Sequence, residues 1–156
     1  MAEMRASASR VIAAPPKVIY TSVADYATHH QHILPPAFSG YEVEQGGRGA
    51  GTVVRFRLKV AGRGQDFRAH VAEPEPGRTL TETDERTGAV TTFRFQPKRS
   101  GTLVTIETVS HRDGLQGTIE RLIAPRLLGR LYRDELDLLD RYARAQAAER
   151  TGQRRS

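Results

Sequence analysis

The stretch TVVRFRLKVAGRGQDFRAHVAE, residues 52–73, decides the fold, because it alternates apolar and charged side chains on both sides of a short glycine-containing link. Strict alternation in a run rich in β-branched and aromatic residues is typical of a strand with one buried and one solvated face. The link AGRG is too short for a crossover connection, so its two strands must pair antiparallel. The stretch therefore predicts a β-hairpin with one wet face.

The same pattern continues in both directions along the chain. Further strands are predicted at YEVEQ, TLTETD, AVTTFRF and TLVTIETVS, and each of the links GGRGAG, EPEPGR, ERTG and KRSG contains glycine. Another strand is predicted over residues 4–13, where the AAPP sequence stops it. GGRGAG lacks the GK[ST] ending of a phosphate loop and is interpreted as a turn. Together these segments predict seven antiparallel strands.

Links of even length place residues of the same parity on one face of the sheet. This parity puts Phe56 opposite Ala69, Ala69 opposite Glu82, Glu82 opposite Phe93, and Phe93 near Ile106. The apolar residues of all these strands then share one face, which another layer must cover. The opposite face carries mostly basic side chains: Arg55, Arg57, Lys59, Arg68, His70 and Arg94.

Helices are predicted before and after this run of strands. Residues 16–26 and 27–34 predict two short helices, bounded by the prolines that precede the first and follow the second. Residues 115–148 carry a broad apolar arc and predict a long helix, bent or broken at Pro125. Only the long helix is large enough to cover the apolar face. We therefore expect one α+β domain over residues 1–148 and a disordered polar tail over residues 149–156.

The order of these elements resembles the START-like superfamily, also called SRPBCC, and more narrowly its polyketide cyclase/dehydrase and lipid transport family. The resemblance rests on IAAPPKVIYTSVADY, PEPGRTLTE and GTLVTIET, and it extends from about Arg5 to Tyr142. It implies a helix-grip fold, in which a curved seven-stranded sheet wraps the C-terminal helix around an elongated cavity. Relatives include lipid carriers, hormone receptors, cyclases and chaperone activators, so it implies no single reaction.

We therefore expect the cavity to bind a hydrophobic or amphipathic small molecule, such as a lipid, a polyketide or an isoprenoid-like compound. Two alternatives stay open: a cyclase or dehydratase that works without a cofactor, and an interaction module that uses the basic outer face of the sheet. The expected ligand-binding residues are His29, Val54, Phe56, Leu58, Phe67, Ala69, Val71, Leu80, Glu82, Phe93, Phe95, Ile106, Leu128, Leu131, Tyr132, Glu135 and Leu139.

Glu82, Glu135 and Tyr132 are the candidates for acid–base chemistry. Glu82 is the only charge in its predicted row, and Glu135 lies near the middle of the apolar arc of the long helix. A carboxylate that loses hydration has a raised pKa unless a cation or hydrogen-bond donors face it. A β-bulge between Pro76 and Asp84 would instead turn Thr81 and Thr83 inward and Glu82 to solvent. The absence of cysteine and of a GxSxG motif gives no support to a nucleophilic mechanism.

The cluster His29, His30 and His32 raises the question of a metal site. His29 and His32 are spaced for chelation, but no third ligand or HExxH motif accompanies them, so no metal is predicted. His29 shares a predicted helical face with Tyr26 and Ile33, so we expect it to face inward and the other two histidines to face solvent.

Composition narrows the partners. The 24 lysine and arginine residues outnumber the 18 acidic residues, which gives a net charge of +6. The basic residues are scattered and have no interleaved aromatic residues, which argues against a nucleic-acid partner. No apolar run approaches the roughly 20 residues of a membrane span, and the N terminus lacks a signal-peptide core, so we expect a cytoplasmic protein without stable membrane insertion. The oligomeric state stays open.

Overall fold

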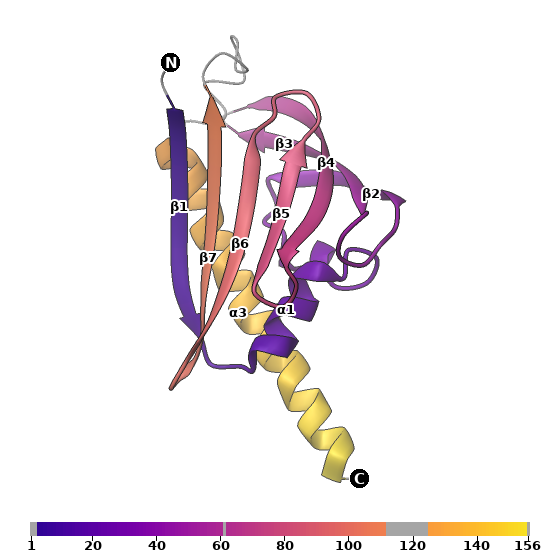
Figure 1. Cartoon of the computed structure of the whole chain (residues 1–156), viewed down its shortest axis with the longest axis vertical. Coiled ribbons are helices and arrows are strands. Elements are labelled where there is room, and N and C mark those ends of the chain that lie inside the picture. Colours follow the sequence, from indigo (N-terminus) through magenta and orange to yellow (C-terminus); the bar gives the residue numbers. More distant parts are fainter. Residues whose placement is uncertain (1–2, 61, 112–124, 156) are drawn as a thin grey trace.

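The structure is a computed structural model that describes residues 3–60, 62–111 and 125–155 (Figure 1). Within these ranges the chain forms seven strands, two α-helices and one 3-10 helix. They are β1 (Glu3–Ile12), α1 (Pro16–Ala24), η1 (His30–Ile33), β2 (Phe38–Gln45), β3 (Val53–Val60), β4 (Arg63–Glu75), β5 (Thr79–Asp84), β6 (Val90–Lys98), β7 (Gly101–His111) and α3 (Pro125–Arg155).

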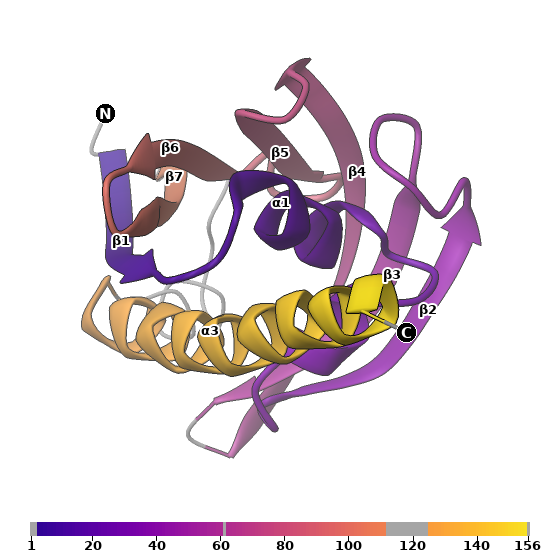
Figure 2. The ribbon, with the colours of Figure 1, turned by 90° about the horizontal axis from the view of Figure 1, so that it is seen from below.

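The strands form one antiparallel sheet in the order β1-β7-β6-β5-β4-β3-β2. Figure 2 shows this sheet curving around α1, with α3 lying across its open side. The α+β helix-grip fold predicted from the sequence is confirmed. The core lies on the concave face, where Leu80, Phe93 and Ile106 are at most 2% exposed.

The register keeps the predicted faces but not every predicted pair. β6 and β7 pair as expected, with Phe93 opposite Ile106. The β3–β4, β4–β5 and β5–β6 pairings are displaced by two residues, so Glu82 lies between Val71 and Thr91 instead of between Ala69 and Phe93. An even displacement leaves each side chain on its predicted face, because side chains alternate with a period of two.

The helical segments differ from the prediction in extent. The second short helix is a single 3-10 turn, His30–Ile33. The part of the long helix predicted before Pro125 lies outside the described residues, and so does the bend expected there. α3 continues to Arg155, through most of the predicted disordered tail, and its last turns extend beyond the sheet (Figure 1). Alanine-rich sequence, such as residues 143–148, favours this continuation.

Candidate functional site

A cavity of about 80 Å³, taken as the space open to the centres of water-sized molecules, lies between the concave face of the sheet and α3. Its walls are mainly aromatic and aliphatic. Many of the predicted residues line it: Val54, Phe56, Leu58, Phe67, Ala69, Glu82, Phe93, Leu128, Leu131, Tyr132 and Glu135.

Other predicted residues share the concave face but do not line the cavity. They are packed in the core with exposures of 5% or less: Val71, Leu80, Phe95, Ile106 and Leu139. Phe95 does not reach the cavity because the ring of Tyr20 from α1 packs edge-on against it, with ring centroids 5.0 Å apart. Helix α1 fills this part of the space enclosed by the sheet (Figure 2).

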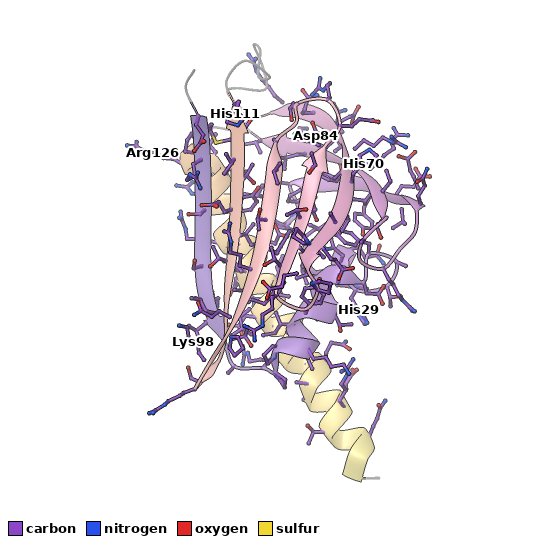
Figure 3. All side chains as sticks on the ribbon, in the orientation of Figure 1. His29, His70, Asp84, Lys98, His111 and Arg126 are labelled. Carbon is purple, nitrogen blue, oxygen red and sulfur yellow. The ribbon has the colours of Figure 1, made fainter. Side chains whose placement is uncertain are left out.

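The prediction that His29 faces the cavity is wrong, and His30 lies there instead. His29 Nδ1 lies 2.6 Å from the Tyr142 hydroxyl, and His29 is not among the described residues that line the cavity. Figure 3 shows His29 near α1, below the part of the sheet that carries the cavity residue Asp84. The helical phase of α1 does not continue into this segment, because Asp25 leaves helical geometry with φ −87° and ψ 85°. A helical wheel that is extended from α1 past Asp25 therefore predicts the wrong histidine to face inward.

His30 is buried and stacks on Tyr26, with ring centroids 4.3 Å apart. Its Nδ1 lies 2.7 Å from the carbonyl oxygen of Val23. A carbonyl only accepts hydrogen bonds, so Nδ1 carries the hydrogen and Nε2 faces Glu82 Oε1 at 3.7 Å. Burial lowers the pKa of His30, although the charge of Glu82 acts in the opposite direction. The neutral ring therefore presents Nε2 as a hydrogen-bond acceptor.

Glu82 points inward from β5 and its side chain is only 14% exposed. The hydroxyl of Tyr26 donates a hydrogen bond of 2.6 Å to Glu82 Oε1. The sheet irregularity between β4 and β5 lies between Ala72 and Glu75, and it does not turn Glu82 to solvent. The structure thus places this carboxylate in the cavity wall with one strong hydrogen-bond donor.

Glu135 faces the cavity from α3 and is 3% exposed. No hydrogen bond or ion pair joins its carboxyl group to another described residue. Burial, and to a smaller degree the charge of Glu82, raises the pKa of Glu135 well above its ordinary value. An empty cavity therefore favours the neutral acid at this position.

Two further polar groups in the cavity wall already have partners. The hydroxyl of Tyr132 makes hydrogen bonds with the threonine pair Thr91 and Thr108, whose hydroxyl oxygens lie 2.7 Å apart. Asp84 accepts hydrogen bonds from the backbone of Arg68 at 3.2 Å and from the backbone and hydroxyl of Thr87 at 2.9 and 2.8 Å. Asp84 thus stabilises the β5–β6 turn.

The sequence analysis missed several lining residues: His30, Leu34, Phe38, Tyr41, Ala89, Thr91 and Thr108. Thr91 and Thr108 could have been found, since they have the same parity as Phe93 and Ile106 in their strands. No alternation marks the segment from η1 to β2, so His30 and Leu34 carry no comparable signal.

The histidine cluster has aromatic neighbours. His29 and His32 both contact the ring of Tyr142, the latter stacked at 5.4 Å. In the part of the chain that the structure describes, no group of three His, Cys, Asp or Glu residues is placed to hold a metal ion.

Among the described helices, none is long and apolar enough to cross a membrane.

The fold, with its cavity between the sheet and α3, defines a helix-grip protein, and comparison with known proteins gives the family. A family model described as polyketide cyclase / dehydrase and lipid transport matches residues 3–144. The chain therefore belongs to the polyketide cyclase/dehydrase and lipid transport family. No curated protein matches the sequence.

Solved structures share the fold over nearly the whole chain. The protein KanY is 28% identical with a TM-score of 0.80, and the match covers 92% of this chain and 99% of KanY. The protein TTHA0849 from Thermus thermophilus is 19% identical with a TM-score of 0.73, and the match covers 92% and 99% of the two chains. The di-domain ARO/CYC StfQ from the steffimycin biosynthetic pathway is 16% identical with a TM-score of 0.69, and the match covers 96% of this chain and 52% of StfQ.

Proposed function

We propose that this protein binds a hydrophobic or amphipathic small molecule, such as a lipid, a polyketide or an isoprenoid-like compound, in the cavity between the sheet and α3. The observation that carries the proposal is the composition of the cavity wall, in which aromatic and aliphatic side chains surround a few inward polar groups. Convergent apolar walls with a small number of polar groups are characteristic of small-molecule sites. The family description, which names polyketides and lipid transport, supports the same class of ligand.

A matched pair of alanine variants tests this proposal. Ala69 is buried in the cavity wall, whereas Ala72 is exposed on the same strand. Ala69→Leu reduces the space for a ligand, and Ala72→Leu adds the same atoms on the outer face. Native mass spectrometry of freshly purified protein should show a retained small molecule in the parent and in Ala72→Leu, and less of it in Ala69→Leu.

Titration with the neutral hydrophobic probe N-phenylnaphthylamine provides a second measurement. Its fluorescence should increase on binding to the parent and to Ala72→Leu, and the apparent affinity of Ala69→Leu should fall by about tenfold, or roughly 1.4 kcal/mol. Equal probe binding by both variants, with no retained molecule in any of the three proteins, would contradict the proposed function.

A cofactor-independent cyclase or dehydratase is the second candidate, and the two cavity glutamates favour it. Glu135 tends toward the neutral acid, and Glu82 accepts a hydrogen bond from Tyr26 in the same cavity wall. A protonated carboxyl group can donate a proton to a substrate while a second carboxyl group nearby accepts one. Loss of turnover in Glu135→Gln and in Glu82→Gln, with the fold retained, would support acid–base catalysis by this pair; turnover unaffected by both changes would exclude the two glutamates as the acid and base.

The interaction module on the outer face has less support. Several of its basic side chains form ion pairs with acidic neighbours at 2.8–3.2 Å, so part of their charge is compensated within the protein. These pairs join Arg57 to Asp66, Arg68 to Glu44 and Glu85, and Arg94 to Glu107. Weaker partner binding by an Arg57→Glu/Arg68→Glu variant would be the result that favours this candidate.

A further inference from the structure

The described residues that line the cavity include acidic side chains but no lysine or arginine. Three carboxyl groups face the cavity, those of Glu82, Asp84 and Glu135. Asp84 accepts hydrogen bonds from the backbone of Arg68 on β4 and from Thr87 in the turn, whereas no lysine or arginine among the described residues forms an ion pair with Glu82 or Glu135. Buried carboxyl groups without a counter-charge are costly, and the folded protein retains these two in a cavity wall that is mainly aromatic and aliphatic.

The hydrogen-bond donors in the wall are mostly engaged. The Tyr26 hydroxyl donates to Glu82, and the Tyr132 hydroxyl belongs to the threonine network of Thr91 and Thr108. The groups left to face a ligand are the carboxyl oxygens of Glu82 and Glu135 and the Nε2 of His30, which is bare in the neutral ring. Glu82 and the His30 Nε2 offer acceptors, and Glu135 becomes an acceptor as well once it releases its proton, so a ligand that brings its own hydrogen-bond donors fits this site.

We infer that the cavity selects a hydrophobic amine, whose ammonium group lies between Glu82 on β5 and Glu135 on α3 while its apolar part contacts the aromatic wall. This inference rests on the proposed function, because it assigns the chemical class of the ligand in the same cavity. An ammonium ion supplies both the missing positive charge and several N–H donors. The rings of Tyr41, Phe56 and Phe67 line the same cavity and offer faces that attract cations as well as apolar groups.

The same features weaken the binding of anionic and neutral ligands. An anionic ligand would bring a further negative charge close to Glu82 and would oppose the ionisation of Glu135 in the buried cavity wall. A neutral alcohol could donate one hydrogen bond, but it supplies no positive charge to either glutamate. The inference therefore predicts an order of affinity for ligands that share one apolar group: amine, then alcohol, then carboxylate.

Phenethylamine, phenethyl alcohol and hydrocinnamate form such a series, and isothermal titration at about pH 7, where an alkyl amine is charged, compares them directly. Phenethylamine should bind about tenfold more tightly than the alcohol, and hydrocinnamate should bind more weakly than both. Equal binding of the amine and the alcohol, or tighter binding of hydrocinnamate, would overturn the inference and leave the proposed function standing. No binding of any of the three would contradict the proposed function as well.

Variants of the two glutamates test which carboxyl group binds the ammonium ion. Glu135→Gln keeps the shape of the side chain and should remove most of the advantage of the amine over the alcohol, and Glu82→Gln should reduce that advantage as well. Glu42→Gln removes the same charge from the exposed side of β2 and should leave the affinity series unchanged. An unchanged series in both cavity variants would overturn the assignment, and the comparison of ligands on the parent protein stays decisive if a variant does not fold.

Discussion

The hydroxyl of Tyr26 donates a 2.6 Å hydrogen bond to Glu82 Oε1, which joins the segment after α1 to the cavity wall on β5. Tyr26 is fully buried, and its backbone carbonyl in turn accepts a hydrogen bond of 2.7 Å from the Tyr41 hydroxyl. The position of Glu82 in the cavity therefore depends on a hydrogen-bond network that reaches from α1 to β2.

Tyr26→Phe tests the energetic weight of this contact. Removing a buried donor from a carboxylate should lower the free energy of unfolding by about 1.5–3 kcal/mol. Tyr41→Phe removes a bond to a neutral carbonyl and should cost less, about 0.5–1.5 kcal/mol. Urea unfolding of both variants measures the difference. A Tyr26→Phe protein as stable as the parent would show that the hydrogen bond contributes nothing to stability.

The charge of Glu82 should also be visible in the titration of His30. Burial lowers the pKa of His30 below its ordinary value of 6.5, and the charge of Glu82 partly offsets this. Glu82→Gln removes the offset, so NMR titration of the ring protons should show a further fall in the pKa of His30. Glu42→Gln, on the exposed side of β2, should leave that pKa in place. A rise in Glu82→Gln would contradict the proposed pairing.

Strand faces could be predicted from the sequence because they depend only on alternation. Glu82 faces the concave side although its neighbours are Val71 and Thr91 and not those expected, since a displacement of two residues preserves the face. Leu80 shows what alternation alone does not predict, which is whether an inward side chain lines the cavity. It lies on the predicted face but is packed in the core, because tertiary packing decides which part of that face remains open.

The helical part of the site was harder to predict. The direction of a side chain can be extrapolated along a helix only while the helix is uninterrupted. The non-helical backbone at Asp25 separates α1 from η1. The inward direction that the sequence predicted for His29 is therefore the direction that the His30 side chain takes. For Glu135 the long α3 is uninterrupted around the residue, and its place on the apolar arc does bring it to the cavity.

Gly101, at the start of β7, should tolerate substitution poorly. Its φ is +143°, and an added Cβ would lie 2.0 Å from the carbonyl oxygen of Ile12 on β1. Gly101→Ala should destabilise the protein by more than about 2 kcal/mol through backbone strain and displacement of β1. Gly77→Ala, at a φ of +83° in open space, should cost about 1 kcal/mol. Similar thermal unfolding of the two variants would argue against the close approach.

The last prediction concerns Glu135 and the dependence of stability on pH. Burial and the charge of Glu82 raise the pKa of Glu135 above its ordinary value of 4.5. The folded protein therefore holds the Glu135 proton more tightly than the unfolded chain does, and this group makes stability fall as pH rises above 4.5 toward the raised pKa. Glu135→Gln removes this contribution, whose slope is at most about 1.4 kcal/mol per pH unit. The variant should gain stability over the parent as pH increases from about 5 to about 8 in urea unfolding. Glu42→Gln, which removes an exposed carboxylate, should show no such gain. A constant difference between Glu135→Gln and the parent across that range would mean that Glu135 ionises in the folded protein as readily as in the unfolded chain.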